Sequence, residues 1–334
     1  MLELHDALAM VTDLACRRRV GLKRVDLPDA FHRILAQDIV LDTNTVPFRG
    51  ATWDDLACCR TNLRNDQNVV ETVTAGTLPC RTLLRAGELI EAADIAVLAG
   101  VGCSRLWVSR RPTVGVIATG SELVEPDRRP KPGRIRNSNS FQLSAMVLAA
   151  SAVPRNYGLV ADDRDAIRAI LREAISENDA VVLSGGISQG DYDLVRGILQ
   201  EDSVELLFDR VGPAPGRPVV FADFNTTLCF GLSGHPVSNF VTFELLVKPF
   251  LYALAGHRFR PAVARGKLIG AVRRRKMDRD LWLPVVLGGD GCVRPLQSRR
   301  SGGLLALCDA NGLVHVPAGV AGFAEGIIVT VRRI

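Results

Sequence analysis

Apolar residues recur every three or four positions at the start of the chain, at Leu4, Leu8, Val11 and Leu14. This spacing places them on one face of a helix, so the pattern predicts an amphipathic helix over residues 1–20. Helical and strand-like runs then follow one another, separated by polar, turn-like stretches. We therefore expect an N-terminal α+β segment over residues 1–111.

A different pattern begins at residue 112, where short apolar runs alternate with amphipathic ones. Helices are expected at 138–151, 164–175, 192–200 and 238–253, and strands at 114–118, 155–160, 180–183, 219–221 and 227–232. Alternation at this spacing is typical of a parallel sheet covered by helices on both faces. The pattern predicts an α/β fold, a three-layer domain with a mostly parallel sheet over residues 112–256.

Residues 257–334 change character again. Short alternating runs at 265–269, 281–287 and 327–331 are separated by turns rich in glycine and proline. This pattern predicts a small C-terminal all-β domain resembling a barrel. The basic run Arg273–Lys276 is interpreted as a solvated loop, with binding of a phosphorylated ligand as the alternative.

The composition is that of a globular protein, with 47% hydrophobic and 23% charged residues, which excludes disordered and fibrous classes. The net charge of +5 is modest for 334 residues, so charge gives no indication of nucleic acid and remains compatible with an anionic small ligand. No run of about eighteen apolar residues and no basic leader followed by an apolar core is evident. We expect no membrane association and a cytoplasmic location.

Eight cysteines are scattered without a C-x-x-C pair. Several lie in apolar runs, so buried reduced thiols explain them best. The adjacent pair Cys58-Cys59 is the exception, but a metal or redox role would need partner residues that the sequence does not place nearby.

Polar loops follow three of the expected strands. They are Thr119–Glu122, Asp162-Asp163 and Ser184–Asp191. Ligands of parallel sheets bind at the carboxyl ends of the strands, so these loops are expected to converge on one edge. Gly185 and Gly186 carry no Cβ, which would let main-chain N–H groups approach an anion.

Each of these features also has a purely structural interpretation. The two glycines could serve only the geometry of a turn, Asp162-Asp163 could cap the next helix, and Glu122 could be a surface residue. Ser233–Ser238 opens a helix, where unpaired N–H groups favour an anion. Within it, His235 is interpreted first as a loop residue that positions the backbone.

Six motifs carry a resemblance to a known family. They are Thr119-Gly-Ser-Glu-Leu123, Asn137-Ser-Asn-Ser140, Ser184-Gly-Gly-Ile-Ser188, Gly190-Asp-Tyr-Asp193, Pro215-Gly-Arg-Pro218 and Gly234-His-Pro-Val-Ser238. In order and spacing they resemble the molybdopterin molybdenumtransferase family, which includes bacterial MoeA and the E domain of gephyrin. The similarity runs from about residue 112 to the end of the chain, and residues 1–110 show a weaker similarity.

The resemblance implies the last step of molybdenum cofactor assembly. Adenylylated molybdopterin is bound, its phosphoanhydride is cleaved with release of AMP, and molybdenum from molybdate is placed on the dithiolene. It also implies Mg²⁺ as cofactor, a homodimer, and contact with other proteins of molybdenum cofactor biosynthesis.

Site residues follow from position in the motifs. The acidic residues with a catalytic role would be Glu122, Asp162, Asp191 and Asp54, of which Glu122 and Asp191 would also bind the metal. The positions that would cradle the ligand are Thr119, Gly120, Ser121, Asn137, Ser138, Ser184, Gly185, Gly186, Ser188, Pro215, Gly216, Arg217, Ser233, Gly234, His235, Pro236 and Ser238.

The chain also departs from the family. The N-terminal run Phe48–Leu56 keeps only Phe48 and Asp54 of the family's pattern, and residues 60–111 are too few for the small β domain that family members insert there. Ala214 replaces a basic residue and Arg217 a lysine, which keeps the charge but not the ammonium geometry. The missing β domain favours one alternative to an active enzyme, a non-catalytic molybdopterin-binding or carrier protein. A third and weaker alternative is an oligomerising structural module, as part of gephyrin is.

Overall fold

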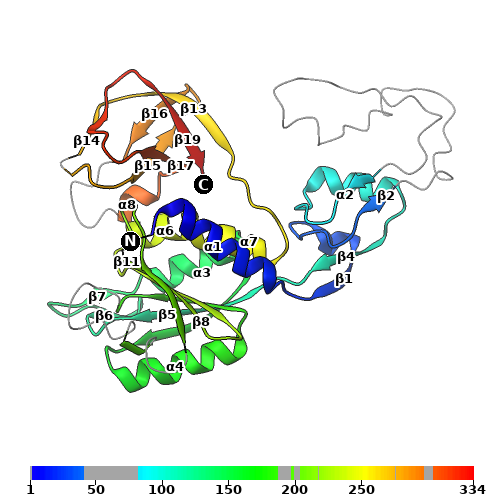
Figure 1. Cartoon of the computed structure of the whole chain (residues 1–334), viewed down its shortest axis with the longest axis horizontal. Coiled ribbons are helices and arrows are strands. Elements are labelled where there is room, and N and C mark those ends of the chain that lie inside the picture. The colour runs from blue at the N-terminus through cyan, green and yellow to red at the C-terminus, as the bar shows by residue number, and fades with distance from the viewer. Residues whose placement is uncertain are drawn as a thin grey trace. The chain divides into compact units, whose positions relative to one another are not determined.

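The computed structural model describes residues 2–40, 82–186, 197–198, 204–216, 218–274, 276–296 and 304–334 (Figure 1). The chain divides into two compact units. One unit comprises Met1–Val20, Arg111–Leu254 and Arg258–Ile334, and the other Gly21–Arg110 with Ala255–His257. The change of pattern after Arg110 therefore coincides with a change of unit. The division into three domains stays a prediction.

The unit that contains Gly21–Arg110 is built from short elements. Its described elements are β1 (Leu22–Asp26), a 3₁₀ turn (Leu27–Ala30), β2 (Ile39–Val40), β3 (Thr82–Leu84), α2 (Ala92–Gly100) and β4 (Arg105–Ser109). The strands pair antiparallel, β1 with β4 and β2 with β3. A capping box starts α2, in which the Glu91 N–H donates to the Asp94 carboxylate at 2.8 Å.

The larger unit is organised around a six-stranded sheet with the order β10-β11-β12-β9-β5-β8. Its strands are β5 (Thr113–Thr119), β8 (Val153–Val160), β9 (Ala180–Ser184), β10 (Glu205–Arg210), β11 (Pro218–Asp223) and β12 (Leu228–Leu232). The four strands β12, β9, β5 and β8 run parallel, whereas β11 pairs antiparallel with both of its neighbours, β12 and β10. The predicted mostly parallel sheet is confirmed, and β10 is a strand that the pattern did not predict.

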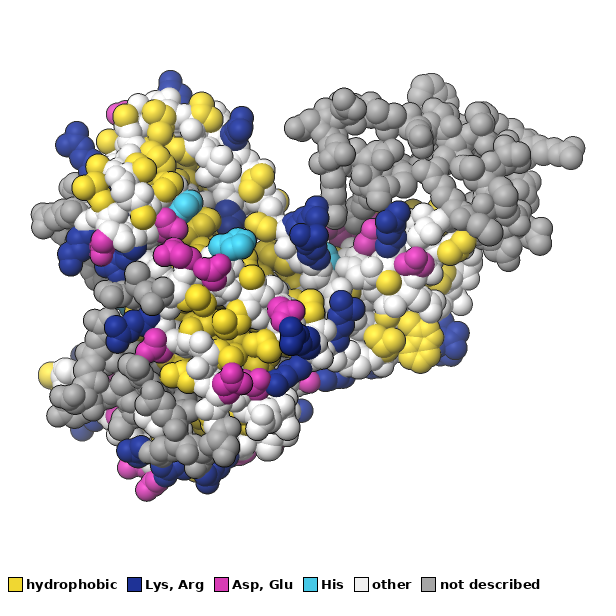
Figure 2. Space-filling model, viewed as in Figure 1, with side chains coloured by type: hydrophobic (Ala, Val, Ile, Leu, Met, Phe, Trp, Pro, Cys, Tyr) yellow, Lys and Arg dark blue, Asp and Glu magenta, His cyan; other side chains and the backbone are white. Residues whose placement is uncertain are grey.

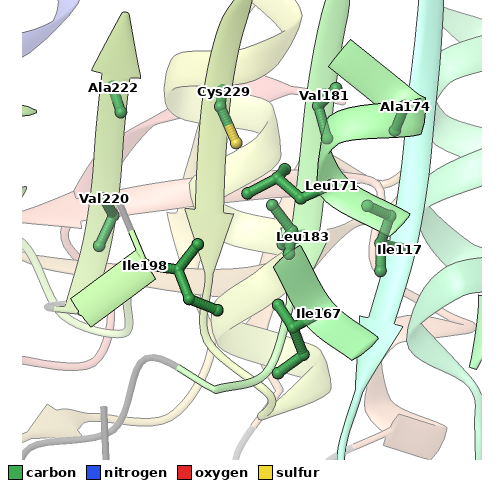
Figure 3. Close-up of a cluster of buried hydrophobic side chains, with 10 residues drawn as sticks. All are labelled: Ile117, Ile167, Leu171, Ala174, Val181, Leu183, Ile198, Val220, Ala222 and Cys229. Atoms are coloured by element: carbon green, nitrogen blue, oxygen red, sulfur yellow. The ribbon is translucent and has the colours of Figure 1, made fainter. Parts of the chain in front are cut away.

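Helices cover both faces of this sheet (Figure 1). On one face α4 (Arg164–Glu177) packs Ile167, Leu171 and Ala174 against side chains of four strands, including Leu183 and Cys229 (Figure 3). The opposite face carries α1 (Leu4–Arg17), α3 (Asn139–Ala149) and the long helix Pro236–Leu254. The three layers predicted from the alternation are therefore present.

An aromatic cluster fixes the long helix to its side of the sheet. Phe221 and Phe230, on neighbouring strands, have ring centroids 4.6 Å apart. Phe250 of the helix meets both rings edge-on, at 6.1 and 5.0 Å. All three side chains are fully buried, so this contact contributes both apolar burial and aromatic geometry to the core.

The helix Pro236–Leu254 is long and apolar enough to cross a membrane by length and composition alone, although no such run was expected from the sequence. However, 83% of its apolar window is buried inside the protein, as for the core helix of a globular domain. It consists of α6 (Pro236–Thr242), a π-helical segment (Phe243–Val247) and α7 (Lys248–Leu254). It starts two residues before the expected position, with Pro236 at its first turn.

The C-terminal residues form a closed five-stranded barrel, which confirms the predicted all-β region. Its strand order is β13-β16-β15-β17-β19. The strands are β13 (Val263–Leu268), β15 (Leu281–Leu287), β16 (Cys292–Pro295), β17 (Gly312–Val316) and β19 (Ile328–Arg333). Outside the barrel, β14 (Val272–Arg273) pairs with β18 (Gly322–Phe323).

Arg274, in the basic run of this region, does not behave as a solvated loop residue. Its guanidinium donates to the carbonyls of Val320, Arg279 and Pro317 at 2.7, 2.6 and 2.6 Å. Arginine presents several N–H donors in one plane, which suits it to gathering carbonyls from separate segments. Arg274 therefore ties the loops of the C-terminal region together.

The cysteines are less uniformly buried than expected. Among those in the described part of the chain, Cys229 is fully buried, whereas Cys16 and Cys308 are exposed. Burial raises the pKa of the Cys229 thiol well above its usual range. Cys58 and Cys59 lie outside the described residues.

Candidate functional site

The carboxyl ends of the parallel strands meet at one edge of the sheet and are tied to each other there. The N–H of Gly120, after β5, donates to the carbonyl of Val160 at the end of β8 at 3.2 Å. The N–H of Gly185, after β9, donates to the Leu232 carbonyl at the end of β12 at 3.1 Å. The loops that follow these four strands are therefore neighbours, as the sequence predicted.

Two of these loops are linked by a reciprocal pair of hydrogen bonds. The Ser121 N–H donates to the Asp162 carboxylate at 2.8 Å, and the Asp162 N–H donates to Ser121 Oγ at 3.0 Å. Asp163, not Asp162, caps helix α4, because its carboxylate accepts from the Ala166 N–H at 2.8 Å. The two adjacent aspartates thus have separate tasks, and Asp162 fixes the loop that presents the exposed Glu122.

Two positions in this edge require glycine. Gly185 has φ +100°, and a Cβ built there would lie 2.2 Å from the Thr119 carbonyl oxygen. Gly216 has φ +114°, and its Cβ would lie 2.2 Å from Thr242 Oγ1 of α6. Both conformations are costly for other residues, so the close approach of the Gly185 loop to β5 and of the Gly216 loop to α6 depends on these glycines. Since the Leu232 carbonyl already accepts from the Gly185 N–H, this amide is not available to an anion.

A buried polar network lies beneath the loops. Ser184 Oγ accepts hydrogen bonds from Asn139 Nδ2 at 2.7 Å and from Asn239 Nδ2 at 3.3 Å. Asn139 Nδ2 also donates to the Gly234 carbonyl at 2.8 Å. The sequence predicted Ser184 and Gly234 as site residues but neither asparagine, although Asn139 lies within the motif Asn137–Ser140 that indicated this region.

Asn137 and Ser138 start helix α3. The side chain of Asn137 is buried and donates to Ser140 Oγ at 2.8 Å, while the Ser138 carbonyl accepts from the Gln142 N–H at 3.0 Å. These bonds hold the first turn of α3 at the strand-end edge. The observed bonds of Asn137 are therefore those of a residue that shapes the helix start.

The loop before α6 forms its own short turn. The His235 N–H donates to Ser233 Oγ at 3.2 Å, and the His235 carbonyl accepts from the Asn239 N–H at 2.9 Å as the helix begins. The His235 side chain is exposed, whereas Ser238 is buried. The bonds described for His235 are main-chain bonds, which agrees with its interpretation as a residue that positions the backbone.

The Pro215–Gly216 loop is held by the barrel. The Ala214 N–H donates to the Asp280 carbonyl and the Trp282 N–H donates to the Ala214 carbonyl, both at 2.7 Å. Ala214 thereby extends the edge of β15 by one parallel bridge with Leu281. Because β11 starts just after this loop and pairs Val219 with Leu232, the loop reaches the same edge as the strand-end loops.

Some predicted residues lie outside the described part of the chain. These are Asp54, Ser188, Asp191 and Arg217. Among the residues that the structure describes, no group of three or more His, Cys, Asp or Glu side chains could hold a metal ion. A cavity of about 650 Å³ lies at the opposite edge of the sheet, between Leu171 and Ile175 of α4 and Thr227 before β12, and contains no predicted site residue.

Acidic and basic side chains are interspersed over the described surface in Figure 2. Nucleic-acid binding proteins instead tend to gather Lys and Arg on one face. The described surface in this view therefore gives no indication of nucleic acid.

Comparisons with known proteins agree with this architecture. Residues 115–253 match the family described as "Probable molybdopterin binding domain", and residues 269–333 match "MoeA C-terminal region (domain IV)". The molybdopterin molybdenumtransferase of Staphylococcus epidermidis is 33% identical over 264 residues, which is 78% of this chain and 62% of that protein. The enzyme of Bacillus subtilis is 32% identical over 255 residues, 75% of this chain and 59% of that protein.

Solved structures show the same fold over the whole chain. A molybdopterin biosynthesis MoeA protein from Pyrococcus horikoshii superposes with a TM-score of 0.78 at 23% identity, covering 100% of this chain and 99% of that one. A molybdenum cofactor biosynthesis protein from Pyrococcus furiosus gives a TM-score of 0.73 at 25% identity, covering 100% of both chains. The chain spans about 60% of the length of the curated relatives it matches, at 62% and 59%. With both family regions present in order and this similarity in sequence and fold, the chain belongs to the molybdopterin molybdenumtransferase (MoeA) family.

Proposed function

We propose that this protein acts in molybdenum cofactor biosynthesis by binding adenylylated molybdopterin and inserting molybdenum from molybdate with release of AMP. The observation that carries the proposal is the convergence of four strand-end loops, tied by the Gly120–Val160 and Gly185–Leu232 bonds, with buried polar side chains beneath them. A ligand with an aromatic head and an anionic tail suits an edge where glycines allow close approach and polar groups fix orientation. The family relationship supports the identity of that ligand.

Within this site we propose separate roles for the acidic residues. Glu122 is exposed on a loop that Asp162 fixes through Ser121, so Asp162 acts as its positioning residue. Asp191 and Asp54 are further acidic residues by their place in the sequence motifs. In the reaction, water adds to a phosphorus of the phosphoanhydride and the P–O–P bond breaks, which releases AMP and leaves the phosphate of molybdopterin.

Mg²⁺ is the metal that we propose for this site. Magnesium is usually bound through one or two carboxylates together with phosphate oxygens of the substrate, and it keeps several waters. Glu122 fits that requirement, with Asp191 as the second ligand. When bound, the ion would offset the charge of the pyrophosphate. A protein-only site is not proposed, because the described residues provide no group of three ligands.

We also propose that the chain works as a homodimer in the cytoplasm and exchanges its pterin substrate with other proteins of molybdenum cofactor biosynthesis. The support for these points is the family relationship. The oligomeric state can be measured directly by light scattering of the purified chain.

A second candidate function is a non-catalytic molybdopterin-binding or carrier protein. The observation that favours it lies in the sequence, where residues 60–111 are too few for the small β domain that family members insert there. A carrier would need the strand-end loops but not the acidic residues that act on the phosphoanhydride.

One experiment separates these candidates. The full chain is incubated with adenylylated molybdopterin, molybdate and magnesium chloride, and AMP is quantified by chromatography. Release of AMP that depends on protein supports the enzyme, and tight pterin binding without AMP supports the carrier. Glu122→Gln should abolish AMP release, while Asp127→Asn, an exposed carboxylate whose described ion pair is a 3.8 Å contact with Arg128, should not.

A further inference from the structure

Three chain segments meet at one buried amide, the side chain of Asn139, which is 8% exposed. It is the first residue of α3, and its Nδ2 donates to Ser184 Oγ, at the end of β9, and to the Gly234 carbonyl, before α6. A carbonyl oxygen can only accept a hydrogen bond, so the Gly234 contact fixes which end of the amide faces it. Both hydrogens of Nδ2 are thereby used, one on each neighbouring loop.

The two loops that Asn139 joins also lie close together. A Cβ built on Gly234 would lie 3.7 Å from Gly185 Cα, so the space between the two main chains is about one side-chain atom wide. Asn239 adds a longer bond to the same Ser184 hydroxyl, at 3.3 Å. The pairing of Leu232 with Ser184 fixes the ends of the two strands, and beyond it this small network joins the Gly185-Gly186 loop to the Gly234-His235 loop.

Stability alone does not explain the network. Asn139 Oδ1, Asn239 Oδ1 and Thr119 Oγ1 are buried and have no hydrogen-bond partner within the described part of the chain. A buried polar atom without a partner costs on the order of 1–3 kcal/mol, whereas an apolar side chain of similar shape avoids that cost. Single buried oxygens without a partner also occur elsewhere in the described chain, as at Asn178 Oδ1, but three of them gather at this edge, which points to a role in arranging the loops.

We propose that Asn139 is a positioning residue that holds the Gly185-Gly186 and Gly234-His235 loops at the spacing needed to bind the pterin-phosphate ligand. The proposal rests on the proposed function for the identity of the ligand. Asn139 touches both loops from the rigid start of α3 and acts through them. Its loss weakens binding more than it slows the chemical step.

The test replaces Asn139 by aspartate, which keeps the shape of the side chain. A carboxylate oxygen would then face the Gly234 carbonyl oxygen at about the present 2.8 Å and repel it. Asn139→Ala serves as the second variant, because it removes the amide without adding charge. Both are compared with the parent by hydrogen exchange of peptides that cover the two loops and by the kinetics of AMP release.

Asn178→Asp is a closely matched control. Asn178 is 7% exposed and its Nδ2 also donates to one carbonyl and one hydroxyl, those of Ala174 and Tyr157, both at 2.8 Å. It lies just before β9, at the end of the strand opposite to Ser184. This variant reproduces the loss of a buried two-donor amide without touching either loop.

For Asn139→Asp or Asn139→Ala we expect faster amide exchange in both loops and a KM for adenylylated molybdopterin about tenfold higher, with kcat within twofold. Asn178→Asp should leave both readouts at parent values. Unchanged loop exchange in folded Asn139 variants, or equal effects of Asn178→Asp on the loops, would overturn the proposal. If the parent releases no AMP and binds no pterin, the proposed function fails, while the exchange measurement still decides whether Asn139 sets the loop spacing.

Discussion

One contact between the barrel and the core helix gives a quantitative prediction. In the π-helical segment, the Lys248 N–H donates to the Phe243 carbonyl, and the next residue, Pro249, has no N–H. Neither Lys248 nor Pro249 therefore has a main-chain N–H that can donate a hydrogen bond to the Glu244 carbonyl oxygen. The guanidinium of Arg332, from β19 of the barrel, donates to this oxygen instead.

Replacing Arg332 by methionine removes this hydrogen bond but keeps an apolar chain beside Phe259, over whose ring the guanidinium carbon lies at 5.8 Å. A buried carbonyl left without a partner costs about 1–3 kcal/mol. Part of this is regained, because burial disfavours the charged guanidinium, as the lowered pKa of Arg332 indicates. We expect Arg332→Met to lower the free energy of unfolding by roughly 1–2 kcal/mol.

Urea denaturation followed by circular dichroism measures this change, with Arg333→Met as the control. Arg333 follows on the same strand, and its side chain is exposed, so its replacement should cost less than about 0.5 kcal/mol. The sharper comparison uses Pro249→Ala, which restores a main-chain N–H that can reach the Glu244 carbonyl. In that background Arg332→Met should cost about 1 kcal/mol less. Equal costs with and without Pro249 would refute the explanation through the missing N–H.

Three further predictions follow from single positions. Gly185→Ala should lower the stability of the fold by more than about 3 kcal/mol in thermal melts, because φ is +100° and the Cβ would lie 2.2 Å from a carbonyl oxygen. The control Gly133→Ala, at φ +80° in open space, should cost about 1–2 kcal/mol. Asp191→Asn should abolish AMP release if the protein is an enzyme and leave pterin binding intact, and retained turnover would contradict the role of Asp191. Cys229 should resist a thiol reagent at pH 8.5 until the protein unfolds, while exposed Cys16 and Cys308 react. Because its folded pKa is raised, the stability that Cys229 contributes is present below the unfolded pKa of about 8.5 and is lost as pH rises further. Cys229→Ala should therefore lose less stability than the parent between pH 8 and pH 10 in urea titrations.

The sheet could be predicted because its central strands are buried on both faces. All five residues of β9 are buried, and such a strand appears in the sequence as an apolar run bounded by polar residues. In β1 only Val25 of the five residues is buried, and β10 is mostly half-buried, so neither strand has a clear pattern. Full burial thus made the central strands easy to recognise, although β8, which has no fully buried residue, was predicted as well.

The candidate site was predictable at the level of loops but not of individual contacts. Strand ends and glycines indicated the edge, because the carboxyl ends of parallel strands must lie together. Which asparagine of the motif Asn137–Ser140 faces inward depends on where α3 starts, and a shift of one residue rotates a helix by about 100°. Asn239 lies inside an apolar helix, and its hydrogen-bond partner Ser184 is 55 residues away, so no local sequence pattern marked Asn239 as a site residue.

The barrel makes two kinds of contact with the α/β part of the same unit. Through Ala214 its strand β15 holds the Pro215–Gly216 loop, and through Arg332 its strand β19 completes the hydrogen bonding of the core helix. Gly216 in turn packs on Thr242 of that helix, one residue before the π-helical segment. The barrel therefore contacts the Pro215–Gly216 loop and the core helix, and the loop contacts the helix. By these contacts the barrel helps to fix the main chain of the loop next to the site. A change that loosens the barrel edge at Leu281 should consequently act on the Pro215–Gly216 loop before it affects the strand-end loops that Ser184 and Asn139 hold.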